Sequence, residues 1–302
     1  MKKIQILMST YNGEKYIREQ LDSIKAQDYP ELSLLIRDDG STDSTLKVVE
    51  DYMQANRDLD ITLIRGDNLG VLDSFMFLVE ASDDDCSYFA FADQDDVWFK
   101  DKISRAIAAL EADGEALFYA GAYLPVDQDL KPIPFRKVSK RPDFYNSIVE
   151  NIAIGCTIVF NRRMKELTTG VDIKGACIHD WWFYILATAV GRIVYDPEPA
   201  LYYRQHSGNA IGSKDSMIKK WKTRFRRLDD WSREIFNHCE LLLENYREQI
   251  SADKIAVLEE LLDYKKLSLF GRASYLFKTP VFRQTRLDQL LFKILLLFKR
   301  IG

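Results

Sequence analysis

Cysteines and long apolar runs are scarce in this sequence, and each absence excludes a class of protein. The four cysteines lie far apart and form no CxxC pair, so neither a zinc knuckle nor a disulfide framework is indicated, and a reducing compartment fits. No apolar run is long enough to span a bilayer, and the apolar residues 4–8 are too short for a signal-peptide core. We therefore expect a cytoplasmic protein that is neither secreted nor transmembrane.

Net charge is also small, but the charge is unevenly distributed. With 42 Lys+Arg against 46 Asp+Glu, the formal net charge is -4, so the chain has no overall positive field that would attract nucleic acid. We therefore do not expect nucleic acid as a partner. Residues 217–302 contain 18 Lys+Arg and 11 Asp+Glu, a net charge of +7, whereas residues 1–216 carry -11. An acidic body thus precedes a basic tail.

The 302 residues are 47% hydrophobic, enough for a substantial core. In the first hundred residues, short apolar runs alternate with amphipathic stretches that have helical spacing. The runs that predict buried strands are residues 4–8, 32–36, 61–64 and 88–92. Repeated strand-helix units predict an α/β fold with a mostly parallel, Rossmann-like sheet covered by helices on both faces. Ligands of such sheets bind beyond the carboxyl ends of the strands.

The later part of the chain changes in character. Further strands are predicted at residues 117–122, 157–160 and 200–203, and long helices at 218–246, 253–270 and 283–300. The apolar seam of residues 218–246 repeats every seven residues, which predicts a homodimer through this helix. An intramolecular hairpin with residues 253–270 would use the same seam.

Polar clusters follow the strands of the first half at the point where each strand ends. They are residues 9–12, 37–41, 67–68 and 93–96. Three carboxylates, Asp93, Asp95 and Asp96, fall within four residues and repel one another unless a cation or hydrogen-bond donors compensate them. Oxygen ligands of this kind suit Mg²⁺ or Mn²⁺ with a phosphate, while a solvated turn is the alternative. For Asp38 and Asp39, helix capping is the simpler interpretation.

Together these motifs resemble a known family. Ser-Thr-Tyr-Asn at 9–12, Asp-Asp-Gly-Ser-Thr-Asp at 38–43, Asp-Gln-Asp at 93–95 and His-Asp at 179–180 are similar to the inverting family 2 glycosyltransferases with the GT-A fold. The resemblance covers residues 1–212. The motifs at 93–98, 179–182 and 203–209 further resemble the rhamnosyltransferases that build streptococcal rhamnose polysaccharides.

The resemblance implies a nucleotide site at the first strand ends. It places the pyrimidine of the donor beside Thr10, Tyr11, Asn12 and Asp39, where an aromatic face stacks on the base and a carboxylate accepts its N3–H. Asn68 or Arg65 would complete this pocket, with a strand-end cap as the alternative.

The resemblance also implies a cation site. Asp93 would contact the ribose, and Asp95 would bind Mg²⁺ or Mn²⁺. Asp96 would lie behind these residues without touching the cation itself. His206 would complete the metal or phosphate site. Arg204 and Asn209 would lie near the diphosphate, in a polar loop suited to close over it.

For catalysis the resemblance implies a general base at Asp180, which would take the proton of the attacking hydroxyl. His179 departs from the Glu that is more frequent in this family motif, so a structural histidine is the alternative for it. Trp181 and Trp182 would wall the acceptor sugar or belong to the core. Residues 155–157 would also lie near the acceptor.

The function implied is transfer of L-rhamnose from dTDP-L-rhamnose to a lipid-linked glycan. A UDP-sugar transferase of the same fold, or a non-catalytic nucleotide-sugar-binding scaffold, are the alternatives. Residues 1–213 would form the catalytic domain, with the nucleotide-sugar half at 1–100 and the acceptor half at 101–213, and residues 214–302 a helical region.

A lipid-linked acceptor implies work at the inner face of the cell membrane. Residues 281–301 form a broad apolar helical stripe with flanking cations, which suits the bilayer interface. A terminal helix docked on the protein body would show the same stripe.

Overall fold

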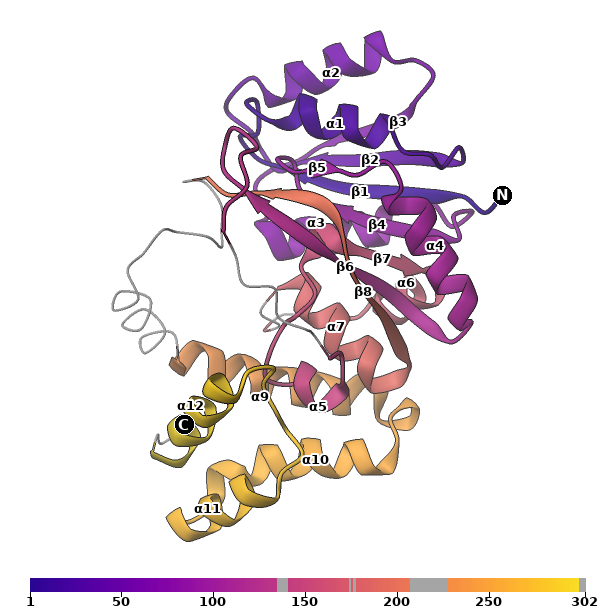
Figure 1. Cartoon of the computed structure of the whole chain (residues 1–302). Helices are drawn as coiled ribbons and strands as arrows, with labels where there is room; N and C mark the ends of the chain where they lie inside the picture. The colour runs from indigo at the N-terminus through magenta and orange to yellow at the C-terminus, as the bar shows by residue number, and fades with distance from the viewer. Residues whose placement is uncertain (135–140, 174, 176–177, 207–227, 299–302) are drawn as a thin grey trace.

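The computed structural model describes residues 1–134, 141–173, 175, 178–206 and 228–298 (Figure 1). In this part of the chain eight strands form one sheet. They are β1 (Ile4–Thr10), β2 (Leu32–Asp38), β3 (Asp60–Arg65), β4 (Tyr88–Ala92), β5 (Val97–Trp98), β6 (Ala116–Val126), β7 (Ile158–Asn161) and β8 (Arg192–Arg204).

The helices alternate with the strands at first and then follow one another. Those within the sheet region are α1 (Ile17–Lys25), α2 (Thr45–Ala55), α3 (Val71–Ala81), α4 (Lys102–Asp113), α5 (Phe144–Ser147), α6 (Arg162–Thr168) and α7 (His179–Val190), with a 3-10 turn, η1, at Gly155–Thr157. The C-terminal group is α9 (Leu228–Tyr246), α10 (Ala252–Asp263), α11 (Leu269–Lys278) and α12 (Arg286–Phe298), with 3-10 turns η2 (Arg247–Gln249) and η3 (Tyr264–Lys266).

The sheet has the order β3-β2-β1-β4-β7-β6-β8-β5. The strands β3, β2, β1 and β4 are all parallel, which confirms the strand-helix units predicted for the first hundred residues. β7 runs antiparallel between β4 and β6, β6 and β8 are parallel, and β5 is antiparallel to β8. The sheet is therefore parallel in its first half and mixed in its second.

Alternation of side chains along the central strands produces two hydrophobic layers. In β1, Ile6 and Met8 point to the layer covered by α1, α2 and α4, whereas Leu7 points to the layer covered by α3, α6 and α7. All five residues of β4 are buried because strands flank it on both edges and helices cover both faces. The predicted fold class, an α/β sheet with helices on both faces followed by helices, is confirmed.

Two details of the predicted elements were wrong. Residues 61–64 are only partly buried, because β3 is an edge strand that pairs with β2 alone. The helix predicted at 253–270 breaks at Asp263, and a new helix, α11, begins where the Ser268 side chain accepts a hydrogen bond from the Gly271 N–H at 3.2 Å.

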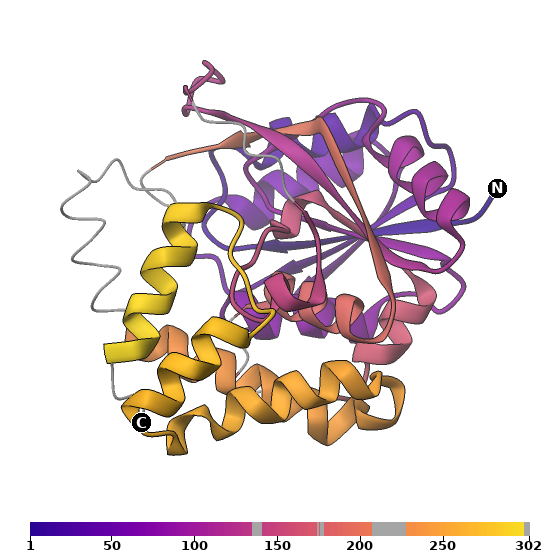
Figure 2. The same cartoon turned by 60° about the horizontal axis from the view of Figure 1, so that its bottom comes forward.

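The C-terminal helices gather on the side of the sheet that carries α5 and α7 (Figures 1 and 2). The seam of α9 is buried within the chain: Ile235, Cys239 and Leu242 are at most 3% exposed and share a hydrophobic cluster with α7 and α10. The seam therefore packs within the chain, as the intramolecular alternative expected. The expectation of a homodimer through the described part of this seam was wrong. Residues 218–227 of the predicted helix lie outside the described residues.

The two predicted regions share one core. The cluster that contains the α9 seam also contains residues of α7 and, in β4, Phe89 and Phe91. Helices α9 and α10 therefore add to the layer covered by α3, α6 and α7. Among the described helices, none is both long and apolar enough to cross a membrane.

Candidate active site

The carboxyl ends of three neighbouring strands bring the predicted nucleotide residues together. In the parallel register Thr10 lies opposite Asp38, and Met8 lies opposite Ala92. The loops that follow β1, β2 and β4 therefore leave the sheet side by side, as the strand-end clusters predicted.

These loops are locked to one another by side-chain amides. Gln94 accepts a hydrogen bond from the Tyr11 N–H and donates one to the Tyr11 carbonyl, both at 2.9 Å. The Asn12 side-chain oxygen accepts from the Thr42 N–H at 2.8 Å. Thr10 is buried and donates to Asp38 at 3.0 Å. Thr10 and Asn12 thus hold the loops, while the Tyr11 ring remains 47% exposed and open to a ligand.

Asp39 fastens the end of β2 to the segment before α3. Its buried carboxylate pairs with Arg37 and accepts the N–H groups of Leu69 at 2.8 Å and Gly70 at 2.9 Å. Asn68 is exposed directly before these two residues. The other residue predicted for this pocket, Arg65, instead forms an exposed ion pair with Glu50.

The acidic turn after β4 is largely buried. Ligand atoms of Asp93, Asp96 and Cys156 lie within 4.8 Å of one another. Burial, together with the negative charges of Asp95 and Asp180, raises the pKa of Asp93 to about 7. Asp96 is fully buried, and burial raises its pKa well above the ordinary value. The turn is therefore a place where a cation or a proton must compensate negative charge.

His206 meets the turn from a distant part of the chain. Its Nε2 lies 2.7 Å from Oδ2 of Asp95, 111 residues away, and its ring packs on Tyr16 with a centroid distance of 5.0 Å. A carboxylate oxygen and an imidazole nitrogen directed at each other are a donor set that Mn²⁺ accepts, and the carboxylate suits Mg²⁺. These residue types fit the predicted cation site, and the structure brings together Asp95 and His206, the two residues predicted to hold the cation.

Arg204, which was predicted near the diphosphate, lies beside the acidic turn and is bonded to protein groups. Its guanidinium is buried, lies over the Tyr16 ring, and donates to the carbonyls of Asp95 at 2.7 Å and Gln128 at 2.6 Å and to the carboxylate of Glu19. Because these protein acceptors engage Nε and both terminal nitrogens, Arg204 positions the acidic turn. Asn209 lies outside the described residues.

Sequence reasoning missed Lys102. Its side chain is fully buried, donates to the Cys156 carbonyl at 2.8 Å and lies 3.0 Å from the centroid of the Trp98 ring. Burial lowers its pKa to about 7, against the opposing effect of Asp96 and Asp93. A lysine at the start of an amphipathic helix ordinarily faces solvent, so the sequence carried no signal for this position.

Asp180 stands at the start of α7, facing the 3-10 turn that begins at Gly155. It is 6% exposed, and its Oδ2 accepts the Gly155 N–H at 3.0 Å. Burial raises its pKa to about 7. The charge of Asp180 contributes to the raised pKa of Asp93, so the two carboxyl groups lie within electrostatic range of each other.

The three residues around Asp180 belong to the core. Trp182 is fully buried, and Trp181 is buried with its indole N–H donating to the Ser147 carbonyl at 2.7 Å. Of the two alternatives predicted for these tryptophans, an acceptor wall or the core, their burial supports the core. His179 stacks on Phe75 at 4.1 Å, and burial lowers its pKa to about 3. Neither of its ring nitrogens has a hydrogen-bond partner among the described residues.

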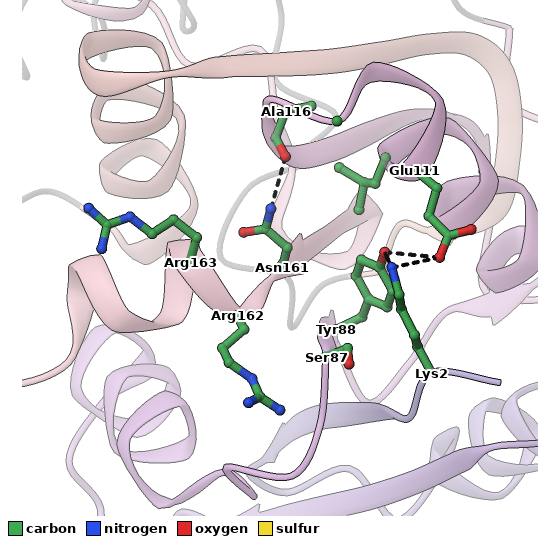
Figure 3. Close-up of a pocket in the computed structure, with 10 residues that line it drawn as sticks. Lys2, Ser87, Tyr88, Glu111, Ala116, Asn161, Arg162 and Arg163 are labelled. Atoms are coloured by element: carbon green, nitrogen blue, oxygen red, sulfur yellow. Dashed lines mark hydrogen bonds and ion pairs between the residues drawn. The ribbon is translucent and has the colours of Figure 1, made fainter.

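A cavity of about 670 Å³ opens at the opposite end of the strands (Figure 3). It lies beside the first residues of β4 and β6, where Lys2 pairs with Glu111 at 3.0 Å and Asn161 donates to the Ala116 carbonyl at 2.9 Å. None of the predicted site residues lines this cavity.

Replacing Arg204 tests its positioning role. We expect Arg204→Met to lower the free energy of unfolding by about 2–4 kcal/mol, since two carbonyls lose a charged donor. Arg65→Met, the same change at an exposed ion pair, should cost less than about 1 kcal/mol. Urea denaturation of both variants measures the difference, and equal losses would contradict the role.

The burial of His179 predicts a pH-dependent effect. Its folded pKa of about 3 lies below the ordinary 6.5, so between these values the unfolded chain binds a proton that the folded chain does not, and stability falls as pH falls. Relative to wild type, His179→Phe should therefore gain about 2 kcal/mol in unfolding free energy between pH 7 and pH 5. A difference that stays constant over this range would show that His179 titrates normally in the folded protein.

Comparison with known proteins reveals relatives by sequence. The profile described as Glycosyl transferase family 2 matches residues 5–166. The dTDP-rhamnosyl transferase RfbG of Shigella flexneri is 31% identical over 228 residues, which cover 71% of this chain and 77% of that protein.

Solved structures share the fold. S. aureus TarS 1-349 in complex with UDP-GlcNAc superimposes with a TM-score of 0.62 at 19% identity, over 99% of this chain and 82% of that chain. The mannosyltransferase PcManGT from Pyrobaculum calidifontis, in complex with GDP-Man and Mn²⁺, gives 0.58 at 18% identity, over 99% and 81%. The profile match over more than half of the sequence and the 31% identical relative show that this chain belongs to glycosyl transferase family 2 and is a glycosyltransferase.

Proposed function

We propose that the enzyme moves L-rhamnose from dTDP-L-rhamnose to a hydroxyl of a lipid-linked cell-wall or capsular polysaccharide, by a single displacement with inversion. The observation that carries the chemistry is that the buried Asp180 carboxyl lies within electrostatic range of Asp93 in the acidic turn, where Asp95 also meets His206. The donor is supported by the 31% identity to a protein named as a dTDP-rhamnosyl transferase.

The donor's base binds at the ends of β1 and β2. The half-exposed Tyr11 ring offers an aromatic face for stacking. Asp39 accepts three hydrogen bonds, and a carboxylate has about four acceptor sites, so one remains for the N3–H of thymine or uracil. Asn68 completes the edge of this pocket.

The diphosphate lies toward the acidic turn. Asp93 meets the ribose, and Asp95 and His206 hold Mg²⁺ or Mn²⁺. When bound, the cation supplies positive charge that neutralises the departing nucleoside diphosphate. Arg204 contributes indirectly, because its bond to the Asp95 carbonyl fixes the turn that carries these groups.

Asp180 removes the proton. The acceptor oxygen forms a bond to the anomeric carbon as the bond from that carbon to the diphosphate oxygen breaks, and the hydroxyl proton passes to the Asp180 carboxylate. The pKa of about 7 is matched to this task, because such a carboxylate is basic enough to take a proton and is still substantially ionised at neutral pH.

A UDP-sugar transferase is the second candidate. Uracil and thymine present the same N3–H to Asp39, and the TarS structure of the same fold is a complex with UDP-GlcNAc. A non-catalytic scaffold is disfavoured, because it would not need Asp95, Asp180 and His206 together.

The proposed lipid-linked acceptor determines where in the cell the enzyme acts. A glycan carried on a lipid is presented at a membrane surface, so we propose that the enzyme acts as a cytoplasmic protein, peripheral at the inner face of the cell membrane. Residues 217–302 have a net charge of +7 and residues 1–216 have a net charge of -11. This difference favours an orientation in which the basic tail faces the anionic headgroups.

Asp180→Asn tests the base. We expect donor binding to persist and turnover to fall by about 10²–10⁴-fold, because the amide cannot take the proton. Wild-type turnover should also decline below pH 7, where Asp180 becomes protonated, and the variant should show a smaller decline, which protonation of Asp93 alone would cause. Asp51→Asn, on the exposed side of α2, is the control and should match wild type. Near-normal transfer by Asp180→Asn would refute the assignment.

A donor panel tests the substrate. Purified enzyme is given dTDP-L-rhamnose, UDP-glucose and UDP-GlcNAc, and sugar hydrolysis and transfer are scored with Mn²⁺ and with a chelator. We expect turnover of dTDP-L-rhamnose alone, lost on chelation and restored by Mn²⁺. Turnover of the UDP-sugars alone would favour the second candidate, and no turnover of any donor would favour the scaffold.

A further inference from the structure

Helices α11 and α12 carry an unusual concentration of exposed apolar side chains. Six of the eleven large apolar side chains that are exposed in the described part of the chain belong to them: Leu269, Phe270 and Phe277 on α11, and Leu287, Leu290 and Ile294 on α12. Phe270 and Phe277 are 89% and 90% exposed and seven residues apart, which puts them on one helix face about 10 Å apart along the axis. Single exposed apolar residues are ordinary in soluble proteins, but such a group marks an interaction surface.

The protein body does not require these side chains for its own packing. On α12, Phe292 and Leu296 are at most 5% exposed and join the main core cluster, and Leu276 does the same for α11. Each helix is therefore already docked through its other face. In its described part, the broad stripe predicted at residues 281–301 has one face on the protein, as the docked alternative expected, and another face in solvent.

Charge is concentrated in the same segment. Residues 265–302 contain nine lysines and arginines and a single acidic residue, Asp288. The preceding residues 228–264 contain three basic and ten acidic residues. Lys278 and Arg286 are exposed on the two helices that carry the apolar side chains.

We propose that the exposed faces of α11 and α12 dock on an anionic lipid bilayer, with Phe270 and Phe277 entering the boundary between headgroups and acyl chains and the flanking cations pairing with lipid phosphates. Exposed aromatic and aliphatic side chains rimmed by cations are what such an interface recognises. This proposal rests on the proposed function, because a lipid-linked acceptor would lie at a membrane.

A second copy of the chain fits this surface poorly. A two-fold dimer places the same patch of both copies face to face, so a segment with nine cations and one anion would oppose itself. An anionic bilayer instead supplies the opposite charge together with an apolar layer.

Vesicle co-sedimentation without any nucleotide sugar tests the proposal. Full-length wild type should bind vesicles of phosphatidylglycerol and phosphatidylcholine, bind pure phosphatidylcholine vesicles weakly, and lose binding in 0.5 M salt, where charges are strongly screened. Phe270→Ser/Phe277→Ser should weaken partition at least tenfold, whereas the matched control Phe270→Leu/Phe277→Leu stays apolar and should bind within about threefold of wild type. Lys278→Gln/Arg286→Gln should weaken binding to the anionic vesicles alone.

The outcomes separate docking from catalysis. Donor hydrolysis in solution, without vesicles, should be the same in all these variants, because none of the changed residues belongs to the proposed site. Equal vesicle binding by wild type and the Ser variant overturns the docking surface even if the enzyme turns over its donor. A Ser-sensitive vesicle interaction supports it even if no tested donor is used. A wild-type dimer in light scattering that becomes a monomer in the Ser variant, with no vesicle binding by either, overturns it in favour of a contact between copies.

Discussion

The buried guanidinium of Arg204 joins parts of the chain that are far apart in sequence. It donates to the carbonyl of Asp95 in the acidic turn and pairs with Glu19 of α1. A charged donor between these acceptors forms stronger hydrogen bonds than a neutral one. His206 follows two residues later and meets Asp95 at 2.7 Å. The proposed donor binding and catalysis depend on the acidic turn that these Arg204 hydrogen bonds hold in place.

Residues whose placement depends on local pattern could be predicted from the sequence. Apolar strands followed at once by polar clusters give a parallel sheet with its ligands at one edge, and the observed pairing of Thr10 with Asp38 follows from that register. The approach of Asp95 and His206 is a different case. No pattern joins residues 111 apart, and only the resemblance to a family brought them together.

Other features depend on which neighbour covers a side chain, and the sequence does not determine this. Trp181 and Trp182 stand at the start of an apolar helix next to the expected base, a position that suits an acceptor wall as well as a core. Both pack against His238 of α9 and are buried. Lys102 has the ordinary place of an exposed lysine but is buried under the acidic turn. The break before α11 depends on the cap at Ser268, which the helical periodicity of 253–270 concealed.

The central claim is that Asp95 and His206, held in place by Arg204, form the cation site at which the nucleotide sugar is activated. Crystals grown with dTDP and Mn²⁺, measured at a wavelength where manganese scatters anomalously, test it most directly. We expect a manganese peak beside the Asp95 carboxylate and the His206 imidazole. A peak at the buried group of Asp93, Asp96 and Cys156 instead, or dTDP bound with no manganese, would contradict it.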